Sequence, residues 1–173
     1  GEYIDQDFNL PGDDDAEKAD DYRGYLASQS GGSWQLLDQS DLPGFDGRGG
    51  DAKFTSGGLY NARVYAGFDD TFDAQGLLAV EGGDTLVLAF RGTDGKDPAI
   101  EDGQTFTGNG LAANYEAFEP LIDAAYDYLL AHPEITGIVV SGHSLGGALA
   151  DVFTLMDADR FRALRPEGLT IVS

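Results

Sequence analysis

Residues 138–147 of this chain read IVVSGHSLGG, and this stretch decides the fold. Three apolar residues typical of a buried strand run directly into a GxSxG turn, and a segment with helical periodicity follows. Such a turn holds Ser144 in a strained backbone conformation and exposes its hydroxyl above the carboxyl end of the strand. Gly142 and Gly146 remove side chains that would collide with the neighbouring strand and helix. The stretch therefore predicts an α/β fold with a nucleophilic serine.

A serine hydroxyl attacks a carbonyl only when a neighbouring base takes its proton. The chain contains two histidines, His132 and His143, and no histidine follows Ser144. His143 adjoins the serine within a tight turn, where neighbouring side chains diverge, and His132 comes at the end of a predicted helix. We therefore expect both histidines to be structural and the base to be absent from residues 1–173.

Outside this stretch, periodicity and turn signals divide the chain into alternating elements. The expected helices are 15–28, 112–131 (with a kink or a restart at Pro120) and 145–161, and the expected strands are 59–65, 76–81, 85–90, 135–141 and 169–172. Apolar residues spaced three and four apart predict one apolar stripe on each of the last two helices, formed by Tyr115, Phe118, Ile122, Ala125 and Leu129 and by Leu145, Leu149, Val152 and Met156. Gly82 and Gly83 predict a hairpin between two of these strands. A strand, a helix and a strand in succession form a βαβ unit, which predicts a largely parallel sheet.

A second motif precedes the first by about fifty residues. Residues 87–93 read VLAFRGT. Together with the GHSLGGA of residues 142–148, this motif resembles the class 3 (fungal-type) lipase family over roughly residues 55–173. The resemblance implies an α/β-hydrolase-like, mainly parallel sheet flanked by helices. It also implies that Thr93 and the Leu145 N–H form the oxyanion hole and that Arg91 is a buried structural residue.

The same resemblance implies a triad in the order Ser, Asp, His, of which this chain holds only Ser144. We therefore expect residues 1–173 to be the N-terminal and central portion of one hydrolase domain, with its C-terminal part missing. A missing C-terminal segment or a second chain of the same protein would supply the triad Asp and His. Within the chain, residues 1–14 are expected to form an acidic arm. Residues 94–110 match the family's lid position, and an ordinary surface loop is equally compatible with them.

The net charge of −21 excludes partners that present phosphates, because such a surface repels nucleic acid and anionic lipid. Salt adaptation and an ordinary acidic surface both remain open as explanations of the charge. The chain has no cysteine and no apolar stretch long enough for a membrane span. No metal or cofactor is expected, because the aspartate clusters at 46–51, 69–73 and 94–97 lack calcium-loop spacing.

These observations predict a serine carboxylic-ester hydrolase, a lipase or esterase, that acts on lipid or other ester substrates through a seryl acyl-enzyme. Two alternatives stay open. The same acyl-enzyme could pass its acyl group to an alcohol, which would make the protein an acyltransferase. A truncated or degenerate hydrolase fold could instead act as a non-catalytic binding module. We further expect a secreted or extracytoplasmic, bacterial-like location.

Overall fold

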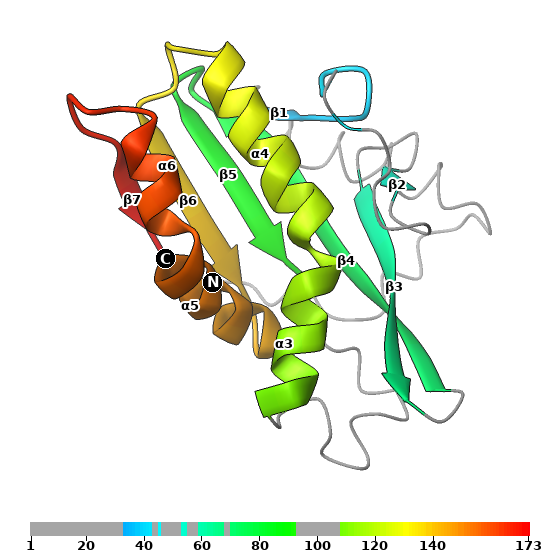
Figure 1. The fold of residues 1–173 in the computed structure, drawn as a ribbon. Coiled ribbons are helices and arrows are strands. Elements are labelled where there is room, and N and C mark those ends of the chain that lie inside the picture. The colour runs from blue at the N-terminus through cyan, green and yellow to red at the C-terminus, as the bar shows by residue number, and fades with distance from the viewer. Residues whose placement is uncertain (1–32, 43–44, 46–52, 55–58, 68–69, 93–107) are drawn as a thin grey trace.

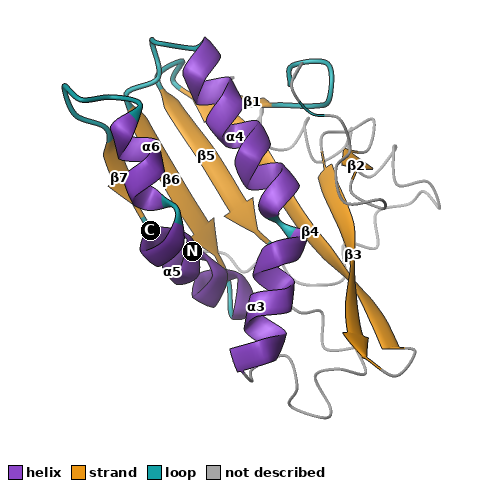
Figure 2. Ribbon diagram, in the orientation of Figure 1, coloured by secondary structure: helices purple, strands orange, loops and turns teal. Residues whose placement is uncertain are grey.

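The computed structural model describes residues 33–42, 45, 53–54, 59–67, 70–92 and 108–173. These residues form a seven-stranded sheet, and the described helices lie on one of its faces (Figures 1 and 2). The strands are β1 (Trp34–Leu36), β2 (Lys53–Phe54), β3 (Leu59–Gly67), β4 (Asp70–Glu81), β5 (Thr85–Phe90), β6 (Gly137–Gly142) and β7 (Thr170–Val172). The helices are α3 (Gly108–Ala117), α4 (Glu119–Ala131), α5 (Leu145–Met156) and α6 (Ala158–Ala163).

The sheet has the order β2-β3-β4-β5-β6-β7, and β1 pairs with the end of β4. The expected α/β architecture is present, but the expected largely parallel pairing holds only from β5 to β7, around the serine turn, whereas the pairing from β2 to β5 is antiparallel. Connection length explains the difference, since antiparallel strands can be joined by a tight turn and parallel strands need a long crossover. Gly82 and Gly83, at φ 61° and 81°, form the tight turn between β4 and β5, which confirms the predicted hairpin. The crossovers to β6 and β7 contain the helices.

The main hydrophobic core lies between the sheet and the helices. On β5, Leu86, Leu88 and Phe90 belong to this core, whereas Val87 belongs to a small second cluster on the other face with Leu36 and Ala79. This alternation follows from the two-residue period of a strand. Every second residue of β5 therefore contributes to the packing of the helices.

The predicted helix 112–131 is two helices that meet at Phe118. Pro120 lies in the first turn of α4, where its missing N–H is no loss, so the predicted restart is confirmed. The predicted apolar stripe is buried throughout, at 8% exposure or less for Tyr115, Phe118, Ile122, Ala125 and Leu129. The spacing of three and four residues therefore located the core face even across a break in the helix.

The predicted helix 145–161 is also broken, at Asp157, into α5 and α6. Its predicted stripe ended at Met156, and this is wrong, because Met156 is 72% exposed. Phe153 occupies the core instead and is fully buried. Residues 145, 149 and 153 share one face of α5. Residue 156 has the same angular position, but it is the last residue of α5, next to the break at Asp157, and its side chain is exposed there.

Aromatic rings join the antiparallel strands to the helices. The rings of Phe45 and Phe54 lie 4.8 Å apart, and both contact Tyr60 edge to face. Phe118 continues the chain of rings, 5.9 Å from Tyr60 and 4.9 Å from Phe90. Tyr60 also donates a hydrogen bond of 2.6 Å to the Ala117 carbonyl at the end of α3, and its burial raises the pKa of its phenol.

Several expectations fall outside the described residues. These are the acidic arm 1–14, the helix 15–28 and residues 94–107 of the expected lid. The last three residues of that expected lid, 108–110, are instead the first turn of α3. In the part of the chain that is described, no helix is long and apolar enough to cross a membrane.

Candidate active site

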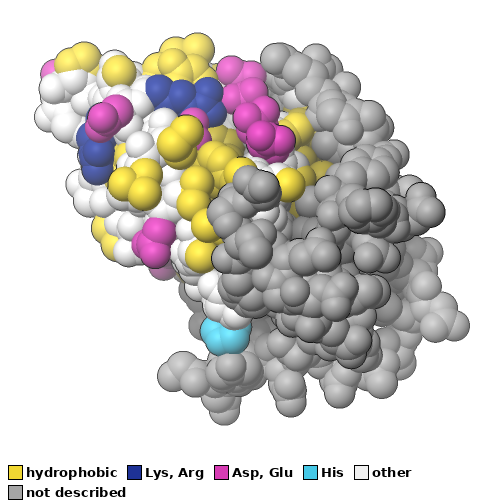
Figure 3. Space-filling view, turned by 60° about the horizontal axis from the view of Figure 1, so that its bottom comes forward, with side chains coloured by type: hydrophobic (Ala, Val, Ile, Leu, Met, Phe, Trp, Pro, Cys, Tyr) yellow, Lys and Arg dark blue, Asp and Glu magenta, His cyan; other side chains and the backbone are white. Residues whose placement is uncertain are grey.

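Ser144 stands at the junction of β6 and α5. Figure 3 turns forward the side of the molecule towards which β5 and β6 run in Figure 1, and a histidine side chain lies on the surface there. The Ser144 backbone has φ 56° and ψ −119°, and among the described residues this serine is the only non-glycine with a positive φ. A residue in such a conformation costs on the order of 1–3 kcal/mol, which the surrounding structure must offset. Ser144 is also exposed. The strained turn thus presents its side chain to solvent, where a substrate can reach it.

Two glycines permit the backbone to fold this tightly. A Cβ on Gly142 would lie 2.2 Å from the Gly146 carbonyl carbon, and a Cβ on Gly146 would lie 2.2 Å from the Phe90 carbonyl oxygen. Both distances are far inside van der Waals contact with backbone that cannot rotate away. The glycines therefore bring the end of β5, the end of β6 and the start of α5 into direct contact.

The Leu145 N–H is placed to donate a hydrogen bond beside Ser144. It is the first N–H of α5, and the first N–H groups of a helix have no partner within it. The next two are satisfied, because Gly146 N–H donates to His143 O at 2.9 Å and Gly147 N–H donates to Ser144 O at 3.0 Å. Within the described part of the chain, Leu145 N–H has no acceptor. This end of the helix also carries the positive end of its dipole.

Thr93 lies outside the described residues, but its neighbour Gly92 is placed. A Cβ on Gly92 would lie 2.4 Å from the His143 carbonyl oxygen and 3.4 Å from the Ser144 Cβ. The segment that leads from β5 to Thr93 is therefore packed against the serine turn. Residues 92 and 144 are far apart in the sequence, so the sequence did not predict this contact. It results from the parallel pairing of β5 with β6, which aligns Phe90 with Gly142.

Arg91 differs from its expected setting, because it is exposed rather than buried. Its backbone N–H donates to the Gln75 carbonyl at 2.8 Å, and its guanidinium donates to the Gln75 side chain. Sequence reasoning missed Gln75. The turn at Gly82 and Gly83 carries the signal that could have located it, since the hairpin register that pairs Gly76 with Phe90 brings residue 75 beside residue 91.

Neither histidine is placed as a base for Ser144 in the way that a triad requires. His143 is exposed and immediately precedes the serine. His132 lies at the other end of β6, where it ends α4, stacks on Tyr128 at 3.9 Å between ring centroids and contacts Glu134 at 2.7 Å. Asp151 is exposed on α5, about 10 Å along the helix from Ser144 at 1.5 Å per residue.

A polar contact fixes α3 to the far end of the serine helix. The Tyr115 hydroxyl donates to the Asp157 carboxylate, which also pairs with Arg160 at 2.6 Å. Burial raises the pKa of Tyr115, and the bond to Asp157 raises it further. The phenol is therefore the hydrogen-bond donor over the ordinary pH range.

The described residues contain no group of three or more histidine, cysteine, aspartate or glutamate side chains that could hold a metal ion. The aspartate clusters 46–51 and 94–97 lie outside them, and so do the side chains of 69–73.

Comparison with known proteins agrees with this geometry. Residues 87–170 match the family model of the lipases of class 3. The match runs from β5, through the serine turn, to the start of β7, so the resemblance predicted from the two motifs is confirmed. The family match supports the interpretation of the protein as a lipase-type enzyme that hydrolyses carboxylic esters. Searches of curated proteins and of solved structures found no match.

The class 3 lipase match covers just under half of the chain. Three rings of the aromatic cluster (Phe45, Phe54 and Tyr60) and the antiparallel strands β2 and β3 lie outside it. The resemblance therefore rests on the region that contains the serine turn and its neighbouring strands.

Proposed function

We propose that this protein is a serine carboxylic-ester hydrolase of the class 3 lipase kind, with Ser144 as its nucleophile. The observation that carries the proposal is the positive φ of Ser144, an exposed serine between β6 and α5. Backbone strain of this kind is retained where function requires it. The family match over residues 87–170 adds support from an independent direction.

In the proposed reaction, the Ser144 Oγ attacks the ester carbonyl carbon and loses its proton to a base. The negative charge that develops on the carbonyl oxygen is stabilised by the Leu145 N–H and by Thr93, which follows the placed residue Gly92. Loss of one such donor typically lowers the rate on the order of 10²–10³-fold. The alcohol leaves with the proton from the base, and water then releases the acid from the acyl-serine by the same steps in reverse.

The triad Asp and His come, in this proposal, from a C-terminal segment or a second chain outside residues 1–173. Neither histidine of the chain serves as the triad base in this proposal. His132 makes its contacts at the far end of β6, and His143 directly precedes Ser144 in a tight turn, where neighbouring side chains diverge. An extracytoplasmic location is part of the same proposal, and the absence of cysteine is compatible with it.

A fluorophosphonate probe tests the nucleophile directly, since it reacts rapidly only with an activated serine. We expect slow labelling of residues 1–173 alone and rapid labelling of Ser144 once a segment with the triad Asp and His is present. Ser144→Ala should abolish labelling and should lower hydrolysis of a p-nitrophenyl ester by a factor on the order of 10⁶. Ser141→Ala is the matched control, because Ser141 is an exposed serine at the end of β6, three residues before Ser144.

Labelling that persists in the Ser144→Ala variant would reject the proposal. Slow labelling of the completed protein, equal to that of residues 1–173 alone, would favour the non-catalytic binding module. Product analysis in the presence of a competing alcohol distinguishes a hydrolase from an acyltransferase. An acyltransferase would form the new ester in preference to the free acid.

A further inference from the structure

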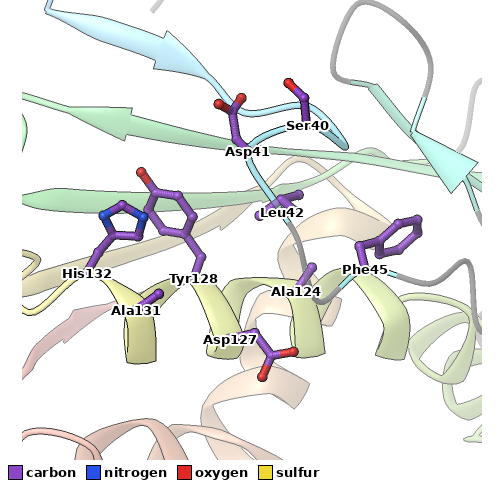
Figure 4. Close-up of a pocket in the computed structure, with 9 residues that line it drawn as sticks. All are labelled: Ser40, Asp41, Leu42, Phe45, Ala124, Asp127, Tyr128, Ala131 and His132. Carbon is purple, nitrogen blue, oxygen red and sulfur yellow. The ribbon is translucent and has the colours of Figure 1, made fainter.

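A second concave site lies at the opposite end of β6 from Ser144. A cavity of about 250 Å³ separates α4 from the segment that follows β1 (Figure 4). His132, one of its lining residues, ends α4 just before the chain enters β6, whereas Ser144 follows the other end of that strand. The six residues of β6 span roughly 20 Å, so the cavity is separate from the proposed active site.

One face of α4 is directed at this cavity rather than at the sheet. Residues 124, 127, 128 and 131 line it, at the spacing of three and four that places side chains on one helix face. The alanines at 124 and 131 are small, which leaves room beside Tyr128. Across the cavity, Leu42 and Phe45 supply an apolar wall, and Leu42 is only 2% exposed. The interior therefore suits an apolar body.

The polar lining is acidic. Asp41 on the segment after β1 and Asp127 on α4 stand on opposite rims (Figure 4). Among the lining residues that the structure describes, none is a lysine or an arginine. The guanidinium of Arg165 donates to the Leu129 and His132 carbonyls at 2.5 and 3.0 Å. The two rim carboxylates favour a positively charged ligand.

Tyr128 offers the cavity an aromatic face. His132 stacks on one side of its ring at 3.9 Å with an interplanar angle of 20°, so the ring has one remaining face and its edge to offer. The side chains of Tyr128 and Leu42 lie next to each other in Figure 4. The pKa of the Tyr128 phenol is raised, first by burial and then by the charges of Asp41 and Glu134.

From these features we propose that the cavity binds a small organic ammonium ion, with its alkyl groups against Leu42 and Phe45 and its charge over Tyr128 between Asp41 and Asp127. An ammonium group over an aromatic face is attracted by the ring quadrupole, and carboxylates nearby add to the attraction. A bare divalent ion does not fit the same walls, because calcium requires six to eight oxygen ligands and gains nothing from an apolar wall.

Choline and its neutral isostere 3,3-dimethyl-1-butanol provide a matched pair of probes, since they differ in charge and hardly in shape. Each is titrated into the ¹⁵N-labelled chain at about pH 8, where carboxylates are ionised. Choline chloride replaces an equal concentration of sodium chloride, so that the ionic strength stays constant. Without this control, salt screening of a chain with a net charge of −21 could itself shift the amide signals. We expect saturable shifts of the α4 amides around residue 128 with a Kd on the order of 1 mM for choline, and binding at least about tenfold weaker for the alcohol.

Two variants and a matched control locate the site. Asp127→Asn should weaken choline binding by about two- to fivefold, as the loss of one rim charge requires. Asp151→Asn removes an equally exposed carboxylate from α5 and should leave the Kd unchanged. Tyr128→Leu should weaken binding more strongly, whereas Tyr128→Phe keeps the ring and should retain it. The amide spectrum of each variant reports whether it is folded.

The proposal is overturned by any of three results: equal binding of the alcohol and choline, equal effects of Asp127→Asn and Asp151→Asn, or no saturable shift up to about 20 mM choline. If Tyr128→Leu does not fold, the probe pair and the two aspartate variants still decide. Ser144→Ala should bind choline normally, so failure of the hydrolase proposal leaves this inference untouched.

Discussion

The two halves of the sheet pack against the helices in different ways. From β5 to β7, around the serine turn, the backbones of the strands and of α5 are in direct contact because glycines have no side chain. A Cβ on Gly142 or Gly146 would lie 2.2 Å from the neighbouring backbone. From β2 to β4, the sheet is joined to the helices by large rings, with Tyr60 and Phe118 fully buried or nearly so. The half that exposes Ser144 is therefore specified by backbone contact, and the half that supports it is specified by side-chain bulk.

The largest loss of stability should come from adding a side chain at the glycine where two backbones are in contact. In the Gly146→Ala variant the new methyl group would overlap the Phe90 carbonyl oxygen, and neither backbone can yield. We expect a loss of more than about 5 kcal/mol in unfolding free energy, or failure to fold, as measured by urea denaturation. Gly147→Ala is the control, since its methyl group would lie 3.4 Å from the nearest atom and should be tolerated. Equal stability of the two variants would contradict the contrast between the halves.

Truncation of a ring should cost less and leave the serine turn intact. Phe118 is 1% exposed and contacts both Tyr60 and Phe90. Phe118→Ala should lower the unfolding free energy by about 3–5 kcal/mol through the cavity it leaves. Leu155→Ala, at a position 83% exposed on α5, should change it by less than about 0.5 kcal/mol. If labelling of Ser144 in the folded fraction also fell, the two halves would be coupled rather than separate.

The smallest effect concerns the contact between Tyr115 and Asp157. Tyr115→Phe deletes the donated hydrogen bond and should cost about 1–2 kcal/mol near neutral pH, because the acceptor is a carboxylate. The dependence on pH gives a sharper signature. Since the folded pKa of Tyr115 is raised above the ordinary value of about 10 for a tyrosine, its contribution is fully present below about pH 10 and is lost as the pH rises further. The stability gap between the wild type and Tyr115→Phe should therefore narrow above pH 10 in chemical denaturation, and a gap that widened there would contradict the assignment.

Much of this arrangement follows from the sequence alone, where local rules act. The apolar run before Ser144, the glycines around it and the stripe from Tyr115 to Leu129 each depend on near neighbours, so strand, turn and buried helix face could be predicted. The hairpin at Gly82 and Gly83 was equally readable, because two residues at positive φ require glycine. The resemblance to class 3 lipases also rested on motifs that are contiguous in the chain.

Other features were decided by tertiary contacts. Met156 and Phe153 have similar hydrophobicity, and only the packing against α6 and the sheet determines that Phe153 is buried and Met156 is exposed. Arg91 was expected to be a buried structural residue, but it follows the last residue of β5, is exposed and bonds to Gln75 across the hairpin. The contact of Gly92 with Ser144 depends on the register of β5 against β6, which joins residues more than fifty positions apart.

The chain by itself thus determined where a serine turn, its glycines and the buried helix stripes would form, because steric rules for glycine and the periods of helix and strand act over a few residues. Tertiary structure alone decided the register of β5 against β6, what lies against Ser144 and how α4 and the segment after β1 enclose a cavity. The physical reason is that these contacts depend on how distant segments fill space together, and no local pattern encodes that.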